Sequence, residues 1–440
     1  MRTVGTGCPP YKKRAACRVP NMKRWLLAWE MGHGLGHLAG LMAVARQALL
    51  HGIEPVIVSS NPLPQSIASP AGCRFLLAPT WPVVAQPLAG TSSMTELLFE
   101  QGFAQPGLLA TRVQRWRDLI DLVAPSAVIT DHAPTALLTA RALAIPAVQL
   151  GTGFAIPPVD GVSMLASFRD WETPNVQRMA QAETAISEAL SHASAITGLP
   201  LAGSVAALYN APAVIRSVPM LDHYTQALRG ETAHYCGPLE LATASSDTPI
   251  PEWPGASARQ GTRILAYLKA AHPLTLPLLN TLAQQHGSLA ISLLAYVEGA
   301  QGIGNPHTNI HIQTTALPFK ALLQGSTVQP GAELVVHQGG IGASSQALLA
   351  GVPQLLLPDM AEAFITARTL VREGVAELLR PEAANELLKK TLEQMTQPTQ
   401  ADRYRERAAV VAAQNTAFSG DNEVLMWGKL THLLASTAFS

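Results

Sequence analysis

The sequence predicts an α/β protein with two Rossmann-like domains, each built on a parallel sheet. Three observations support this fold class. Short apolar runs alternate with amphipathic helical stretches in both halves of the chain, which is the pattern of βαβ units. A segment rich in proline, serine, threonine and alanine, residues 237–261, separates the two halves and has the composition of a linker. The length of 440 residues suits two domains of about 200 residues each.

The composition is that of a folded protein without a strong overall charge. Apolar residues make up 48% of the chain and charged residues 14%, which excludes a disordered chain. Thirty basic residues balance thirty acidic ones, so the net charge favours neither nucleic acid nor an anionic membrane. No apolar run reaches about 18 residues, so we expect no transmembrane segment, and peripheral membrane contact stays open. The four cysteines fit neither a zinc site nor a disulfide framework, so we expect a cytoplasmic protein with free thiols.

The first segment, residues 1–21, differs from the rest of the chain. It contains two basic clusters and two of the four cysteines, but no apolar core of a secretory signal. Met22 directly precedes the first buried run. We therefore expect residues 1–21 to be a disordered extension or to follow from a wrongly placed start. Limited proteolysis that leaves this segment intact would contradict that expectation.

The first predicted domain spans residues 22–236. A strand, a glycine turn, a helix and a second strand form its first βαβ unit, and Gly52 ends the helix. A loop region, rich in glycine, proline and aromatic residues, and a plain helix complete the domain. The predicted elements, in chain order, are strand 24–30, turn 32–36, helix 37–50, strand 56–58, strand 127–129, helix 134–143, strand 147–150, loop 151–175 and helix 176–195.

The second predicted domain spans residues 262–419, where the alternation of strands and helices restarts. Its clearest elements are strands 264–268, 289–294, 310–313 and 333–336 and helix 276–285. A final helix, within residues 420–440, follows Gly420. We expect this helix to cross back onto the first domain.

The strongest motif is a glycine-rich turn, His337-Gln338-Gly339-Gly340-Ile341-Gly342, between a buried strand and a helix. Glycines let a backbone approach a ligand closely, and the amides of residues 343–345 with the helix dipole would form an anion site. The alternative is a tight strand–helix connection without a ligand. After a further strand come Asp359 and Glu362, at the sheet edge where ligands bind in open α/β sheets. Each could accept bonds from sugar hydroxyls or simply cap the next helix.

Residues 333–376 resemble the donor-binding signature of the family 1, GT-B-fold glycosyltransferases, which include the UDP-glycosyltransferases and macrolide glycosyltransferases. Further similarity lies in the approach 309–323, in Gly36-His37 with Gly52, in 125–131 with 144–146, and in Cys236-Gly237-Pro238. The resemblance implies two domains that face each other across a cleft. The matching positions of the signature are Gly340, Gly342, Ser344, Ala347, Leu348, Gly351, Val352, Pro353, Pro358 and Ala367.

The resemblance also implies which residues bind the donor, with several departures from the family pattern. Gln338 stands where the family has a diphosphate-contacting histidine, and His337 lies one place early. A neutral glutamine donates to phosphate but brings no positive charge, so it should stabilise a departing diphosphate less well. The implied donor-binding residues are Leu317, His337, Gln338, Gly340, Gly342, Ala343, Ser344, Gln346 and Glu362. Among them Ala343 replaces Ser or Thr, Gln346 replaces a ribose-contacting Glu, and Glu362-Ala363 replaces Asp-Gln.

Catalysis of sugar transfer to a hydroxyl requires a base, and a histidine held by a carboxylate suits this role. By resemblance, His37 is the base and Asp131 is its partner. Both follow strands of the same predicted sheet, so a contact is plausible. The alternatives are a helix N-terminal residue without a catalytic role for His37 and a helix N-cap for Asp131. His33 is a competing base.

Together these residues predict an inverting, nucleotide-sugar-dependent hexosyltransferase that acts on a hydroxyl of a small-molecule or lipid acceptor. The co-substrate would be a UDP- or dTDP-linked sugar, with no metal, no other cofactor and no nucleic acid. Residues 61–115 and 151–175, expected to be loops, would contact the acceptor. Two alternatives stay open: a nucleotide-sugar epimerase of the same fold, and a non-catalytic nucleotide-sugar-binding protein, suggested by Gln338, Ala343 and Gln346. A dinucleotide dehydrogenase is disfavoured, because this chain has no acidic residue after the second strand to anchor a ribose.

Overall fold

A computed structural model describes residues 23–32, 34–63, 67, 69–79, 90–230, 233–240, 250–255, 261–285, 291–300, 303–305, 307–327 and 329–437. The predicted extension 1–21, the competing base His33 and most of the predicted linker lie outside the described residues. No helix in the described part of the chain combines the length and the apolar character that crossing a membrane requires.

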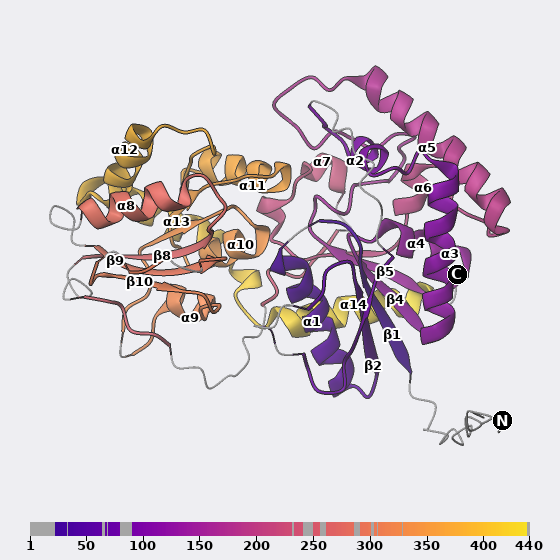
Figure 1. Ribbon diagram of the computed structural model, residues 1–440, viewed down its shortest axis with the longest axis horizontal. Coiled ribbons are helices and arrows are strands. Elements are labelled where there is room, and N and C mark those ends of the chain that lie inside the picture. Colours follow the sequence, from indigo (N-terminus) through magenta and orange to yellow (C-terminus); the bar gives the residue numbers. More distant parts are fainter. Residues whose placement is uncertain are drawn as a thin grey trace, which may run out of the picture.

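Two parallel sheets, each with helices around it, make up the described structure, and this confirms the predicted fold class (Figure 1). The first sheet has the order β3-β2-β1-β4-β5-β6-β7. Its strands are β1 Arg24–Trp29, β2 Glu54–Ser59, β3 Arg74–Leu77, β4 Ala127–Asp131, β5 Ala147–Gly151, β6 Ala213–Ile215 and β7 His234–Tyr235. The helices of this unit are α1 Leu35–Leu50, α2 Met94–Glu100, α3 Pro106–Val123, α4 Pro134–Ala142, α5 Val176–Thr197, α6 Val205–Tyr209 and α7 Gln226–Arg229.

The second sheet has the order β10-β9-β8-β11-β12-β13. Its strands are β8 Thr262–Lys269, β9 Ile291–Glu298, β10 Ile310–Gln313, β11 Leu334–His337, β12 Gln354–Leu356 and β13 Ala376–Leu378. The helices that follow the strands are α8 Thr275–Gln285, α9 Phe319–Gln324, α10 Ile341–Leu349, α11 Ala361–Arg372, α12 Asn385–Thr396, α13 Pro398–Gln414 and α14 Asn422–Thr437.

The strand order of each sheet determines where a ligand can bind. In the first sheet β1 and β4 are neighbours, with Trp29 opposite Asp131, and the strand order reverses between them. In the second sheet the same reversal separates β8 from β11. A crevice forms outside the carboxyl ends of parallel strands at such a reversal, because the connecting helices leave in opposite directions. His37 and Asp131 lie at the first reversal, and the glycine-rich turn lies at the second.

The last helix, α14, packs on the first unit although it follows the second in the chain (Figure 1). Trp427 stacks on Trp25 with ring centroids 5.0 Å apart, and Met426 and Leu430 are fully buried in the same apolar cluster as α1. An ion pair between Arg46 and Glu423 ties α1 to α14. Burial of these side chains is the main force that holds the two units together at this side.

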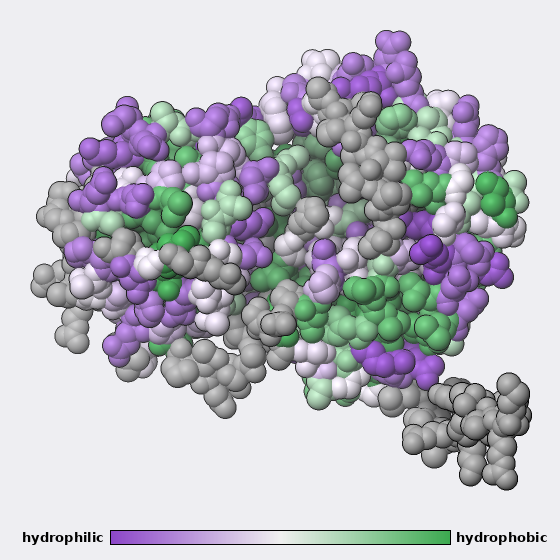
Figure 2. Space-filling view, viewed as in Figure 1, coloured by the Kyte–Doolittle hydropathy of each residue, from purple (hydrophilic) through white to green (hydrophobic). Residues whose placement is uncertain are grey.

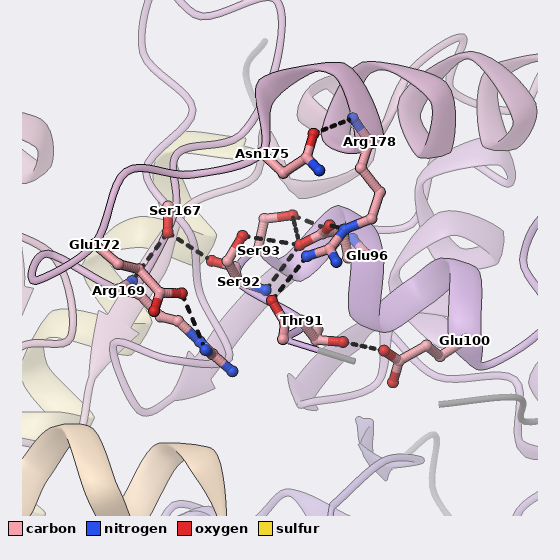
Figure 3. A network of polar contacts seen from close by, with 11 residues as sticks. Thr91, Ser92, Ser93, Glu96, Glu100, Ser167, Arg169, Glu172, Asn175 and Arg178 are labelled. Carbon is pink, nitrogen blue, oxygen red and sulfur yellow. Dashed lines mark hydrogen bonds and ion pairs between the residues drawn. The ribbon is translucent and has the colours of Figure 1, made fainter. Parts of the chain in front are cut away.

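The expectation of an irregular stretch at residues 61–115 is wrong in part, because β3, α2 and the start of α3 lie there. The buried carboxylate of Glu96, in the first turn of α2, holds this segment in place. It accepts hydrogen bonds from the amide and hydroxyl of Ser92, and it pairs with Arg178 of α5 (Figure 3). Ser93 caps α2, because its hydroxyl oxygen accepts from the Glu96 amide.

The same network joins the two segments that we expect to face an acceptor. The hydroxyl of Ser167 and the amide of Phe168 both donate to the carbonyl of Ser92, at 2.9 Å each. Figure 3 shows Ser167 and Ser92 side by side, with Asn175 and Arg178 at the start of α5 above them. Residues 90–93 and 165–169 therefore form one connected wall of the first unit.

The distribution of residues on the surface follows the layers. Figure 2 shows hydrophilic residues over the outer helices α5 and α12 and a hydrophobic area over α1 and β2. The end of α1 contributes Leu50, which is 77% exposed. Single exposed apolar side chains are common on folded proteins.

Candidate functional site

A cavity of about 550 Å³ lies between the two units. The first unit contributes the turn from Gly34 to His37, Thr152 and Arg216. The second unit contributes the approach to α9, the glycine-rich turn and the residues that follow β12. The cavity therefore lies between the two strand-order reversals, and residues from both units reach it.

His37 and Asp131 meet in the first wall of this cavity. The Nδ1 atom of His37, in the first turn of α1, lies 2.9 Å from Oδ1 of Asp131, the last residue of β4. Asp131 is fully buried, and Trp29 stacks on the imidazole with ring centroids 5.0 Å apart. Burial raises the pKa of Asp131, but the charges of Arg216 and His37 outweigh it, so the net pKa lies below the usual value. An ionised Asp131 accepts from Nδ1–H and leaves Nε2 of His37 free to act as a base.

A glycine keeps the Nε2 atom of His37 uncovered. Gly32 has a φ of 85°, and a Cβ at this position would lie 2.7 Å from Nε2. The alternative role of Asp131 as a helix cap is excluded, because the N-cap of α4 is Ala133. Instead Glu30 accepts hydrogen bonds from the amides of Thr135 and Ala136 at the start of α4. Asp131 is thus available for the histidine.

A second histidine lies beside the His37–Asp131 pair. His132 has a φ of 47°, rare for a residue with a side chain, and its ring centroid is 6.0 Å from that of His37. Its Nε2 atom is buried and has no partner among the described residues. Burial, with a smaller contribution from the charge of His37, lowers the pKa of His132 to about 4, so its ring is neutral near pH 7.

Arg216 completes the group, and the sequence alone did not indicate it. It follows β6, two strands away from β4, and its Nε donates to Oδ2 of Asp131 at 3.2 Å. Its second terminal nitrogen, Nη2, is 3.5 Å from Nδ1 of His37. One signal for it exists in the sequence, because a charged residue directly after a buried strand lies at the ligand-binding edge of a parallel sheet.

On the opposite wall, the glycine-rich turn leads from β11 into α10. Gly339 has a φ of 80°, and a Cβ there would be 2.9 Å from the carbonyl oxygen of Ala363, so only glycine fits. α10 begins at Ile341, and its first hydrogen bond joins the Ser344 amide to the Gly340 carbonyl. The expectation of unpaired amides at 343–345 is therefore wrong for Ser344, while Ala343 precedes the first helical bond. The amides that precede this bond are those of 341–343.

His337 and Ser344 support this turn from inside the protein. The Nε2 atom of His337 lies 2.9 Å from Oε1 of Gln354, and its Nδ1 accepts from the Gly339 amide at 3.1 Å. Burial lowers the pKa of His337 to about 4, so its ring is neutral. With both nitrogens engaged, the ring has no donor left for a phosphate, although it lines the cavity. Ser344 is fully buried and is not among the residues that line the cavity.

Two glutamines offer unused polar atoms at the same wall. The Nε2 atom of Gln338 and the Oε1 atom of Gln346 are buried and have no hydrogen-bond partner within the described residues. Both residues line the cavity, as do Leu317, Gly340, Gly342 and Ala343. A buried polar atom without a partner is costly, so a bound polar ligand would relieve both atoms.

Glu362, in the first turn of α11, faces the first unit. Its pKa lies below the usual value: burial raises it, but the charges of His223 and His37 and a hydrogen bond from Thr152 outweigh that effect. Neither Glu362 nor Asp359 caps α11, whose N-cap is Met360 without a side-chain bond. The capping alternative for these two carboxylates is therefore excluded, and both line the cavity.

The two units also touch beside the cavity. Trp171 of the first unit packs edge-on against Phe364, with ring centroids 5.8 Å apart. The guanidinium of Arg368 lies 4.4 Å from the centre of the Trp171 ring. Val218 and Leu221 share an apolar cluster with Ile341, the first residue of α10. These contacts hold the two walls of the cavity opposite each other.

Comparison with known proteins agrees with this geometry. Residues 296–428 match the family model of the C-terminal domain of erythromycin biosynthesis protein CIII-like proteins. No curated protein sequence matches the chain.

Three solved structures with a similar fold share less than a fifth of their residues with this chain. The calicheamicin glycosyltransferase CalG4 is 18% identical, with a TM-score of 0.65 over 95% of this chain and 99% of that one. Glycosyltransferase VinC, solved with dTDP, is 17% identical, with a TM-score of 0.63 over 94% and 100%. The spinosyn rhamnosyltransferase SpnG is 18% identical, with a TM-score of 0.62 over 92% and 99%.

The fold of these neighbours covers nearly the whole chain, while the family model covers the part that contains the glycine-rich turn. The resemblance found in the sequence is thereby confirmed. The chain has the GT-B fold of these glycosyltransferases, and its residues 296–428 match the C-terminal domain of erythromycin biosynthesis protein CIII-like proteins.

Proposed function

We propose that the protein is an inverting glycosyltransferase that moves a hexose from a nucleotide diphosphate to a hydroxyl of a small or lipophilic acceptor. One arrangement supports this function most. The His37–Asp131 pair and the N-terminus of α10 lie on opposite walls of one cavity. Transfer requires a base for the acceptor and stabilisation of the departing diphosphate, and these two walls offer one each.

The second unit would hold the donor. The amides of 341–343, at the positive end of the α10 dipole, suit a diphosphate, and the free Nε2 of Gln338 adds a donor. The free Oε1 of Gln346 can accept from a ribose hydroxyl, and Glu362 can accept from the sugar. The backbone around Leu317 would meet the base. The neighbours VinC and SpnG were solved with dTDP and thymidine diphosphate, which favours a dTDP-linked donor.

In the proposed reaction the Nε2 atom of His37 takes the proton of the acceptor hydroxyl. The acceptor oxygen forms a bond to the anomeric carbon while the bond from that carbon to the diphosphate oxygen breaks. The electron pair of the broken bond stays on the diphosphate, and the attack from the opposite face inverts the anomeric configuration. Asp131 stabilises the imidazolium that forms, and the proton then leaves to water.

The acceptor would enter from the first unit. The connected wall formed by residues 90–93 and 165–169 would contact it together with the loop from 151 onward, of which Thr152 lines the cavity. SpnG was solved with the spinosyn aglycone, which favours an apolar small-molecule acceptor. The cytoplasmic location stays a prediction from the sequence.

One observation favours a second candidate, a non-catalytic nucleotide-sugar-binding protein. The side chains of Gln338 and Gln346 are neutral, so neither brings charge to a leaving group. The buried His37–Asp131 pair favours an enzyme, because a binding protein has no use for an oriented base.

A donor panel separates these candidates. The purified protein would be incubated with UDP- and dTDP-linked hexoses and deoxyhexoses, with and without a set of apolar hydroxylated acceptors, and nucleoside diphosphate release would be measured. We expect release from at least one donor that rises when an acceptor is added. Binding of a donor without release under any condition would support the binding protein, and no binding at all would refute both.

A further inference from the structure

The guanidinium of Arg216 is only partly used by the protein. Its side chain is 5% exposed, Nε donates to Asp131, and Nη2 lies near His37. Nη1 forms no hydrogen bond with a described residue, and it lies 3.6 Å from the position that a Cβ on Gly36 would take. Arg216 lines the cavity. A buried guanidinium with unused N–H groups at a cavity wall has donors available for an anion.

The chain that follows Arg216 leads directly to the opposite wall. Val218 and Leu221 are buried against Ile341, the first residue of α10. Glu362, on α11, also feels the charge of Arg216. The guanidinium thus contacts the His37–Asp131 pair and lines the same cavity as the helix N-terminus that suits a diphosphate.

The other positive charges of the cavity already have acidic partners. Lys320 is 2.9 Å from Glu240, and Lys269 is 4.0 Å from Asp359. These lysines and Arg216 are the Lys and Arg side chains that the described structure places along the cavity. A nucleoside diphosphate carries two or more negative charges, and a helix N-terminus supplies about half a positive charge.

The electrostatics of the buried group change when His37 takes a proton. Asp131 and Arg216 form a neutral pair, so the protonated group carries one net positive charge. Without Arg216 the same group would only become neutral. The added charge arises at the moment when the bond to the diphosphate breaks and negative charge gathers on the leaving oxygen.

We propose that Arg216 is a catalytic residue that binds the diphosphate of the donor through Nη1 while its Nε holds Asp131. This rests on the proposed function, and it supplies the cation that the neutral Gln338 does not. Arginine is suited to this because its planar group can bond a carboxylate on one edge and a phosphate on another. A role in positioning Asp131 alone would use only the Nε edge.

The test is calorimetric binding of dTDP, dTMP and thymidine, or the uridine series if the wild type prefers it, to Arg216→Lys and Arg216→Met. We expect Arg216→Met to weaken diphosphate binding by about tenfold or more while monophosphate binding changes less than about threefold. The diphosphate affinity of Arg216→Lys should lie in between, because lysine keeps the charge but loses the planar group that can bond two partners at once. The double variant Asp131→Asn with Arg216→Met removes both buried charges and should show the same selective loss even if the single variant folds poorly.

Arg46→Met is the control, since Arg46 also forms a partly buried ion pair in the first unit but does not line the cavity. It should leave all three affinities unchanged. Equal diphosphate affinity in wild type and both Arg216→Met proteins would overturn the proposal, as would an equal loss for diphosphate and monophosphate. A wild type that binds no nucleotide would refute the proposed function itself, a result that is distinct from these two.

Discussion

Replacing Asp131 by Asn tests the buried group formed by His37, Asp131 and Arg216, on which both folding stability and the proposed catalysis depend. Asp131 is fully buried and carries two charge-assisted contacts, 2.9 Å to His37 and 3.2 Å to Arg216. An asparagine keeps one acceptor oxygen, but its amide nitrogen would face a donor, either His37 or Arg216. The guanidinium of Arg216 would also lose its counter-charge. Breaking a buried ion pair in this way costs about 3–5 kcal/mol. In a unit of about 200 residues we expect a fall in Tm of roughly 6–20 °C.

The pH dependence of this loss has a definite sign. The pKa of Asp131 is lowered in the folded protein, so its stabilising effect is complete above the unfolded value of about 3.9 and is lost as the pH falls through the folded value. The Tm difference between wild type and Asp131→Asn should thus be full at pH 7 and shrink below about pH 4.

Calorimetric unfolding scans at several pH values measure this difference. Asp118→Asn, an exposed carboxylate on α3, is the control and should change Tm little. The reasoning fails if Asp131→Asn unfolds at the wild-type temperature at pH 7, or if a large difference persists unchanged down to pH 3.

Three further predictions concern the frame of the site. Leu430→Ala on α14 removes a fully buried side chain and should lower the free energy of unfolding by about 2–5 kcal/mol, measured by denaturant titration, and an unchanged midpoint would contradict the packing of α14 on the first unit. The pKa of His337 is lowered to about 4, so the folded protein favours the neutral ring, and the free energy of unfolding should fall by about 2 kcal/mol between pH 6.5 and pH 5. His337→Gln should lose this part of the pH dependence. Identical pH profiles of the two proteins would show that the ring is not buried and neutral. Gly339→Ala should weaken nucleotide binding in a titration, because its Cβ would meet the Ala363 carbonyl. The control Gly198→Ala, with a φ of 68° but open space around it, should only lower Tm. Equal nucleotide affinity in both variants would refute the tight turn.

Much of the fold could be predicted because the strands of its two sheets are short apolar runs that alternate with helical stretches. β1, β2 and β4 were recognisable in this way, and the carboxyl ends of neighbouring parallel strands brought His37 and Asp131 together as predicted. The elements within 61–115 were less visible, because α2 is only seven residues long. Its position depends on the buried Glu96 and on Arg178, which lies 82 residues away in the chain.

The parts of the site that sequence reasoning missed depend on contacts between distant segments. Arg216 reaches Asp131 across 85 positions, and this contact exists only because β6 follows β5 in the sheet order. The engaged state of His337 depends on Gln354 in the neighbouring strand β12. The unpaired amides were assigned too late in the chain because Gly340, rather than a polar residue, is the N-cap of α10.

The most direct test of the account is a comparison of wild type and His37→Ala with the same donor, acceptor and nucleotide. Nucleoside diphosphate release and binding of dTDP or UDP would be measured on each protein, with His192→Ala, an exposed histidine on α5, as the control. If His37 is the base, release should fall by about 10²–10⁴-fold in His37→Ala while nucleotide affinity stays at the wild-type value. Release at the wild-type rate would contradict the central claim, because the base would then lie elsewhere.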